Sequence, residues 1–206
     1  MNYWDNLFSD GLIWGKDAAD SAIWTAGFFD DNQIKKVLIP GIGYGRNTIP
    51  FLSKNMDITG IEISKNAIDI AKYNTPKIKI HHGSVLDMPF DNELYGGIYC
   101  YSLIHLFDQS ERENILASCF NQLAFNGYLV MVVISTESNN YGKGKIVSRN
   151  RFLLENGIKV YFYDADSIKE EFQKFGLIDY KLYPEPIKFM TNEEPLICYR
   201  VLCRKP

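Results

Sequence analysis

The chain has 206 residues, 46% of them hydrophobic and 23% charged, which is typical of one globular domain with one sizeable core. Its apolar runs are far shorter than the about 20 residues that a membrane span needs, and no signal peptide is visible, so we expect a soluble cytoplasmic protein. The net charge of −3, without a cluster of Lys and Arg, disfavours a nucleic-acid partner.

Short apolar runs and amphipathic segments alternate along the chain. Such alternation predicts an α/β sandwich, with a mostly parallel sheet between helices on both faces. Seven strands are expected, at 37–39, 58–62, 78–82, 97–101, 128–134, 177–183 and 196–203. The last two are joined by a proline-containing loop without a helical pattern, so they should pair as a C-terminal antiparallel hairpin.

The helices show start and stop signals. Asp108 with Glu111 forms a capping pattern before an apolar stripe over 115–123, and a second stripe over 165–175 ends at Gly176. Pro50 suits the first turn of the helix after the glycines, and Ser64 is a candidate N-cap. Residues 135–163 have no strong period and are interpreted as an insertion over the strand ends, where open α/β sheets bind ligands.

The four cysteines are not paired in sequence. Cys100, Cys119, Cys198 and Cys203 form no CxxC motif, and no histidine lies at zinc-ligand spacing from them. We therefore expect reduced, buried thiols and no metal site.

The segment KKVLIPGIGYGRN carries the strongest functional signal. Gly41, Gly43 and Gly45 alternate between an apolar run and the next helix, and Glu62 ends the following apolar run 17 positions later. Glycine permits close approach of a ligand, a helix start attracts an anion, and a strand-terminal carboxylate can accept hydrogen bonds from a ribose diol. The same glycines can also serve packing alone, and nicotinamide enzymes use the different spacing G-x-G-x-x-G.

The G-x-G-x-G spacing resembles the first motif of the class I S-adenosylmethionine (SAM)-dependent methyltransferases. GIEIS resembles their second motif, HHGSVLDMPF the third, GGIYCYSLIHLF the fourth and FNGYLVMVV the fifth-strand motif, so the resemblance covers nearly the whole chain. It implies a single domain over 1–206 with a Rossmann-like seven-stranded sheet. VLIPG and YWDNLFSDGLIWG also resemble the thiopurine, thiol and tellurite-resistance methyltransferases, which act on small molecules.

The resemblance assigns roles to particular residues. SAM, leaving as S-adenosylhomocysteine (SAH), would contact Gly41, Ile42, Gly43, Gly45, Arg46, Asn47, Glu62, Ile63, Ser84, Val85, Tyr101 and Ser102. Tyr101 and His105 are the catalytic candidates, although either can be a packing residue. Within the N-terminal segment 1–30 and the insertion 135–163, Trp14, Tyr141 and Lys143 are candidates for covering the active site and binding substrate.

The resulting prediction is in-line methyl transfer from SAM to a small-molecule acceptor. Three alternatives stay open: a SAM-binding module without activity, a methyltransferase acting on protein or RNA, and a nicotinamide dehydrogenase. The acceptor atom, the use of a general base and the oligomeric state are not determined by the sequence.

Overall fold

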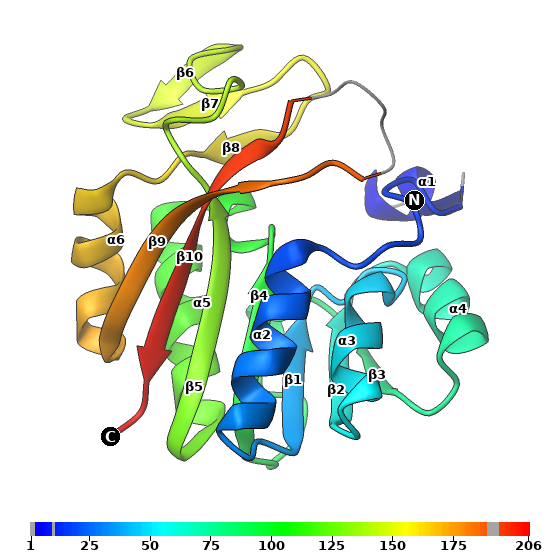
Figure 1. Ribbon diagram of the computed structural model, residues 1–206. Helices are drawn as coiled ribbons and strands as arrows, with labels where there is room; N and C mark the ends of the chain where they lie inside the picture. Colours follow the sequence, from blue (N-terminus) through cyan, green and yellow to red (C-terminus); the bar gives the residue numbers. More distant parts are fainter. Residues whose placement is uncertain (1–2, 10, 189–193) are drawn as a thin grey trace.

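The computed structural model describes residues 3–9, 11–188 and 194–206, and it is built around one seven-stranded sheet (Figure 1). The strand order is β3-β2-β1-β4-β5-β10-β9. The strands are β1 (Lys36–Pro40), β2 (Asp57–Glu62), β3 (Lys79–His82), β4 (Tyr95–Tyr101), β5 (Leu123–Ile134), β9 (Leu177–Glu185) and β10 (Leu196–Arg204). β10 runs antiparallel to both of its neighbours, whereas β1 to β5 are parallel. The predicted fold class and the C-terminal hairpin are therefore confirmed.

Helices cover both faces of the sheet. α2 (Asp20–Asp31), α3 (Ile49–Ser53) and α4 (Lys65–Asn74) pack on one face through a core that includes Phe29, Phe51 and Ala71. α5 (Gln109–Gln122) and α6 (Ala165–Phe172) pack on the other face through Ile115, Leu116 and Phe172. Burial of these apolar side chains on both faces explains why the central strands are almost continuously apolar.

The predicted helix signals are found in the structure. Asp108 and Glu111 form both hydrogen bonds of a capping box at the start of α5, each 2.9 Å long. Ser64 caps α4 by accepting a hydrogen bond from Ala67, and Pro50 lies in the first turn of α3. The largest difference from the expected boundaries is at β5, which begins at Leu123 and not at residue 128, directly after α5, because Leu123 already pairs with Tyr95 of β4.

The segment 135–163 contains a second sheet that the sequence did not predict. Its strands are β6 (Lys145–Ser148), β7 (Arg151–Leu153) and β8 (Lys159–Tyr161), all antiparallel. Phe152, Val160 and Phe162 join it to Ile134 at the end of β5. Figure 1 shows this small sheet beyond the carboxyl ends of the central strands, and α1 (Tyr3–Ser9) at the same end of the molecule.

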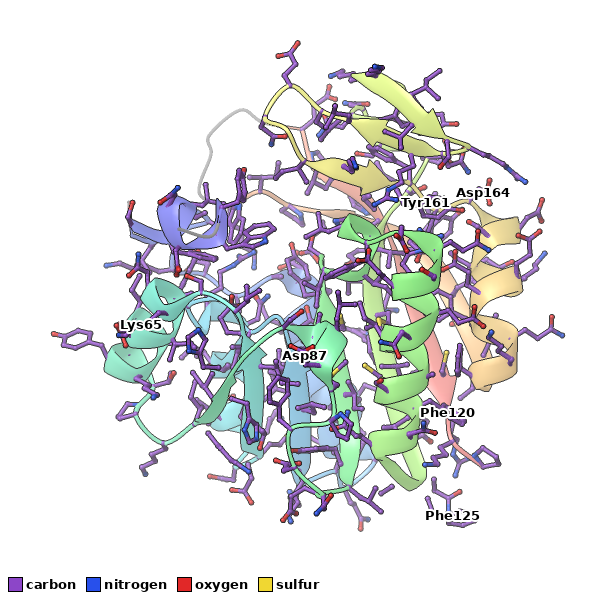
Figure 2. The ribbon with its side chains drawn as sticks, turned by 180° about the vertical axis from the view of Figure 1, so that it is seen from behind. Lys65, Asp87, Phe120, Phe125, Tyr161 and Asp164 are labelled. Atoms are coloured by element: carbon purple, nitrogen blue, oxygen red, sulfur yellow. The ribbon has the colours of Figure 1, made fainter. Side chains whose placement is uncertain are left out.

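Figure 2 shows the same arrangement from behind, with Tyr161 of the small sheet at one end and Phe125 at the other. The site residues expected after the strands therefore lie at the end that carries Tyr161. Within the part of the chain that the structure describes, no helix has the length and hydropathy needed to cross a membrane.

Candidate functional site

The glycine loop follows β1 directly. Gly41, Gly43 and Gly45 have φ values of 66°, 58° and 82°, in the left-handed region that favours glycine. A Cβ at Gly41 would lie 2.9 Å from the Leu103 side chain, so packing also requires this glycine. A Cβ at Gly43 would meet only the Phe8 ring, 3.9 Å away. Gly43 is thus the position where the loop itself leaves room for close approach.

Most backbone donors of the loop bind internal acceptors. The N–H groups of Gly41 and Ile42 donate to Ile61 O, and that of Gly45 donates to Ile42 O. The loop continues into a 3₁₀ turn, Arg46–Thr48, and then into α3, which has only five residues. The expected strong helix dipole is therefore reduced to a short turn, and an anion here would depend mainly on side chains.

Glu62 ends β2 beside this loop and is only 6% exposed. Its Oε2 accepts from the Gly43 N–H at 2.8 Å, and its Oε1 accepts from the N–H groups of Ile63 and Ser64, both at 2.9 Å. Burial raises the pKa of the Glu62 carboxyl, and these three backbone donors partly oppose the rise. A direct hydrogen bond therefore joins Glu62 to the glycine loop, and the cofactor-binding role of both stays a prediction.

Arg46 and Asn47 point toward the segment before α2. Asn47 Oδ1 accepts from the Ala19 N–H at 2.9 Å, and Arg46 Nη1 donates to Asp17 O at 2.8 Å. The Arg46 guanidinium also lies 5.5 Å from the centre of the Tyr101 ring. Arg46 therefore reaches the end of β4, where a cation–π contact places positive charge beside Tyr101.

The candidates after β2 and β3 have different environments. Ile63 is 39% exposed, although it follows a buried carboxylate directly in the chain. Ser84 Oγ accepts from the Leu86 N–H, and Val85 is buried in the core. Of these three, Ile63 offers the accessible apolar surface that could pack against a planar ring.

The end of β4 is strained. Ser102 has φ = 53°, unusual for a residue with a side chain, and its N–H donates to Val132 O at 3.0 Å. Tyr101 stacks on Tyr99, and burial raises the pKa of its phenol. Strain of this kind is often found where a backbone turn presents groups to a ligand.

His105 lies in the interior, 6% exposed, after Ser102. Its Nδ1 faces the Ile134 N–H at 3.4 Å, and burial lowers its pKa to about 4. The ring is consequently neutral at physiological pH and lies against the end of β5. A catalytic role for His105 stays a prediction, and this environment favours a structural one.

Aromatic residues of the N-terminal segment cover the glycine loop. Phe8 packs edge-on against Trp14 and Tyr44, with ring centroids 5.4 and 5.9 Å apart. The Tyr44 hydroxyl donates to Gly15 O and accepts from the Trp14 N–H. Within the segment 1–30, Phe8 and Trp14 thus lie over the loop, whereas α2 packs on the sheet.

Tyr141 and Lys143 belong to the insertion. The Tyr141 ring packs on Phe152 and Phe162, and its hydroxyl donates to Asn150 Oδ1 at 2.9 Å. Lys143 is exposed in the turn before β6. The contacts of Tyr141 lie within the insertion, so the role of Tyr141 and Lys143 as substrate residues stays a prediction.

Two carboxylates that the sequence did not single out also lie at this end. Asp5 of α1 accepts from Ser64 Oγ at 2.7 Å, which fixes α1 on the start of α4. Glu185, at the end of β9, is 1% exposed and binds the start of α2. No local pattern could have indicated these contacts, because their partners are 59 and 165 positions away.

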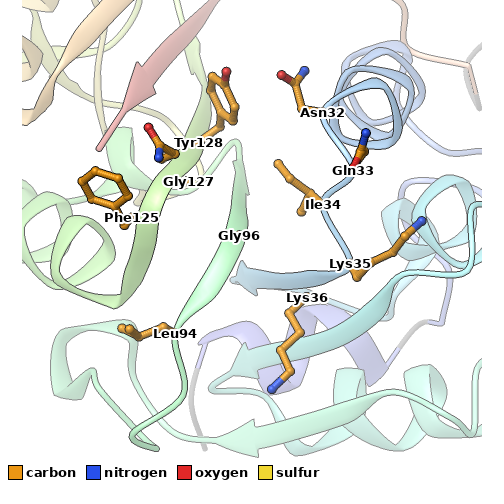
Figure 3. Close-up of a pocket in the computed structure, with 11 residues that line it drawn as sticks. Asn32, Gln33, Ile34, Lys35, Lys36, Leu94, Gly96, Phe125, Gly127 and Tyr128 are labelled. Atoms are coloured by element: carbon orange, nitrogen blue, oxygen red, sulfur yellow. The ribbon is translucent and has the colours of Figure 1, made fainter. Parts of the chain in front are cut away.

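A surface cavity lies at the opposite end of the sheet, near the amino ends of the parallel strands. The cavity has a volume of about 370 Å³, and its lining residues, drawn in Figure 3, include Lys36, Leu94, Gly96 and Phe125. These residues are at the amino ends of β1 and β4 and in the first part of β5. The cavity is therefore separate from the glycine loop and Glu62.

Comparison with known proteins agrees with this geometry. Residues 37–127, from β1 to the first part of β5, match a family model described as "Methyltransferase domain". None of the curated proteins compared with the chain matches it.

Several solved structures share the fold. The 1,6-didemethyltoxoflavin-N1-methyltransferase of Burkholderia thailandensis, solved with S-adenosylhomocysteine, is 17% identical, with a TM-score of 0.72 over 97% of this chain and 84% of that one. TehB of Haemophilus influenzae is 15% identical (TM-score 0.69; 98% and 67% covered), and the N-methyltransferase NodS of Bradyrhizobium japonicum is 14% identical (0.66; 98% and 92%). The chain thus resembles the SAM-dependent methyltransferases in its Rossmann-like fold and, over residues 37–127, in its sequence.

Proposed function

We propose that this protein is a SAM-dependent methyltransferase that acts on a small-molecule acceptor. The observation that carries the proposal is the bond between Gly43 and Glu62, which fixes a buried carboxylate against a left-handed glycine loop after adjacent parallel strands. In this fold class, ligands bind at the carboxyl ends of the strands, where the order reverses, and β1 and β4 are neighbours at that point here.

The residues at the carboxyl ends of these strands fit the parts of SAM. Glu62 would accept a hydrogen bond from the ribose, and Ile63, with Ser84 and Val85, would lie against the adenine. Arg46, Asn47 and the loop of Gly41, Ile42, Gly43 and Gly45 would hold the methionine carboxylate. A carboxylate acceptor, an exposed apolar side chain and a cation at one edge match the donor, apolar and anionic groups of this cofactor.

When bound, SAM supplies a methyl group that is electrophilic because it is attached to a sulfonium. The chain's contribution is to hold donor and acceptor in line, which can supply about 7–11 kcal/mol of the barrier. Tyr101 and Ser102, at the strained end of β4, are proposed to border the place where the methyl group meets the acceptor. Because burial lowers the pKa of His105 to about 4, its ring is a weak base, and we favour an acceptor that needs little help from a base, such as a thiolate.

Residues 1–206 are proposed to form a single domain in which the segment before α2 and the insertion 135–163 cover the site. The position of α1 and the small sheet at one end of the molecule supports this (Figure 1). Trp14 would exclude water above the loop, and Tyr141 and Lys143 would border the acceptor. The cytoplasmic location also stays a prediction.

Calorimetry with SAM and SAH tests the proposal. We expect micromolar binding to the wild type and its loss in Glu62→Ala, with transfer of a labelled methyl group to small-molecule acceptors. Absence of binding to the wild type would refute the proposal. Binding without transfer to any acceptor class would favour a non-enzymatic SAM-binding module, and transfer to protein or RNA alone would correct the acceptor class.

A further inference from the structure

Glu185 makes an unusual long-range helix cap. Its Oε1 accepts from the Asp20 N–H at 2.8 Å, and its Oε2 accepts from the Ser21 N–H at 3.2 Å and from the Tyr183 hydroxyl at 2.7 Å. The residue at the N-cap position of α2, Ala19, has no side chain that could do this. The last strand pair of the sheet therefore fixes the start of a helix from the N-terminal part of the chain.

The residues just before this cap hold Arg46 and Asn47. The Ala19 N–H donates to Asn47 Oδ1 at 2.9 Å, and Asp17 O accepts from Arg46 Nη1 at 2.8 Å. Segment 17–21 is thus bound on one side by Glu185 and on the other by the two side chains that follow the glycine loop. A shift of this segment would move the hydrogen-bond partners of both.

A second connection runs to the end of β4. Ser21 Oγ and the Tyr99 hydroxyl are 2.9 Å apart, and the Tyr99 ring stacks on Tyr101 at a centroid distance of 6.3 Å. Arg46 lies over the other partner of that stack, Tyr101. Glu185 is therefore connected to Arg46 through segment 17–21, and to Tyr101 through Ser21 and Tyr99.

A buried carboxylate is costly to desolvate unless its acceptor sites are used. A neutral capping residue such as Ser at position 19 would cap α2 locally without burying a charge. The cap from Glu185 has one effect that a local cap would lack, since it makes the position of segment 17–21 depend on the β9–β10 hairpin. This dependence indicates a role in fixing the geometry of the site.

We propose that Glu185 is a positioning residue for the part of the site that holds the amino-acid end of the cofactor. It acts through segment 17–21 on Arg46 and Asn47 and does not itself touch the cofactor. The inference rests on the proposed function, because it assigns the region of Arg46 and Asn47 to the methionine carboxylate.

The test compares two ligands that differ by this amino-acid end. SAH has it, whereas 5′-methylthioadenosine has the same adenine, ribose and sulfur without it. In Glu185→Gln, one acceptor oxygen becomes an amide NH₂ that faces N–H and O–H donors. We expect the affinity for SAH to fall about 10-fold, the effect of one charge-assisted hydrogen bond, and that for 5′-methylthioadenosine to stay within about twofold.

Two variants serve as controls. Asp108→Asn weakens the analogous cap of α5, on the opposite face of the sheet, and should leave both affinities unchanged. Tyr183→Phe removes one donor to Glu185 but keeps the two backbone bonds, and should also leave the ratio of affinities unchanged. If Glu185→Gln does not fold, Glu185→Asp keeps the charge, moves it by one methylene and should show the same selective loss for SAH.

The outcomes separate the two hypotheses. An equal loss for both ligands, or no loss in a folded variant, would overturn the role of Glu185 while leaving the SAM site intact. Failure of the wild type to bind either ligand would overturn both the proposed function and this inference.

Discussion

Gly43 and Glu62 are joined by a hydrogen bond of 2.8 Å from the Gly43 N–H to Glu62 Oε2. An ionised carboxylate offers about four acceptor positions, and backbone N–H groups occupy three of them here. One position remains for a ribose hydroxyl. To bind both hydroxyls of a diol, the carboxylate would have to share an acceptor position or release the glycine loop.

The first prediction concerns this carboxylate. Glu62→Gln removes the charge and turns an NH₂ group toward backbone donors, so the affinity for SAH should fall about 10- to 100-fold, corresponding to the about 1.5–3 kcal/mol of a charged hydrogen bond. Calorimetry measures the change. Asp91→Asn, which removes a carboxylate bound to Lys79 and His81 away from the loop, is the control. An unchanged SAH affinity in Glu62→Gln would exclude Glu62 as a ligand.

Much of the architecture could be predicted because it depends on local pattern. The central strands are buried on both faces and therefore read as continuous apolar runs, and the prolines between residues 183 and 196 exclude a crossover helix. The small sheet was missed because every residue of β6 is exposed. Its neighbouring apolar residues Ile146 and Val147 therefore do not show the alternation of apolar and polar side chains that marks a half-buried strand.

The site could be predicted only in part, for a related reason. The glycines and Glu62 are close in sequence and follow neighbouring strands, so fold class alone brings them together. The orientation of Arg46 toward Asp17, and of Glu185 toward Asp20, depends on tertiary contacts between distant segments. Such contacts leave no periodic signal in the sequence.

The second prediction concerns His105 and pH. Burial lowers its folded-state pKa to about 4, below the ordinary value of 6.5, so the folded protein resists protonation of this ring. The contribution of neutral His105 to the free energy of unfolding is fully present above pH 6.5 and is lost as pH falls from 6.5 toward 4. When the pH is lowered from about 7.5 to about 5, the free energy of unfolding should fall by about 2 kcal/mol because of His105.

Denaturant unfolding of the wild type and of His105→Asn at both pH values measures this effect. Asn offers an oxygen that can accept from the Ile134 N–H but does not titrate in this range. Glu62, whose pKa is raised by burial, changes stability in the opposite direction and is present in both proteins, so the difference between them isolates His105. Equal pH dependence in the two proteins would contradict the prediction.

The third prediction concerns the four cysteines. All are buried, and burial raises the thiol pKa of Cys100, Cys198 and Cys203 to about 12. Because the thiolate is the reactive form, a thiol reagent such as dithionitrobenzoate should react with none of them within minutes at about pH 8, and with four per chain in denaturant. A rapid reaction of one thiol in the native protein would reveal local opening of the core.

The fourth prediction concerns α1 as a cover over the glycine loop. Phe8 is 3% exposed and belongs to a small cluster with Tyr44 and Ala67, separate from the two main cores. Phe8→Ala should therefore loosen α1 more than the domain. We expect the dissociation rate of SAH to rise about 10-fold, in keeping with the loss of about 1.4 kcal/mol of closing contacts, while the thermal midpoint changes by a few degrees.

Stopped-flow tryptophan fluorescence can follow this dissociation, because Trp4 and Trp14 both pack against Phe8. Phe125→Ala is the matched control: the same truncation is made on a ring that is 78% exposed at the opposite end of the sheet (Figure 2). It should leave the dissociation rate unchanged. If Phe8→Ala releases SAH at the wild-type rate, α1 does not limit exit from the site, and its aromatic residues serve only to anchor the N-terminal segment on α4.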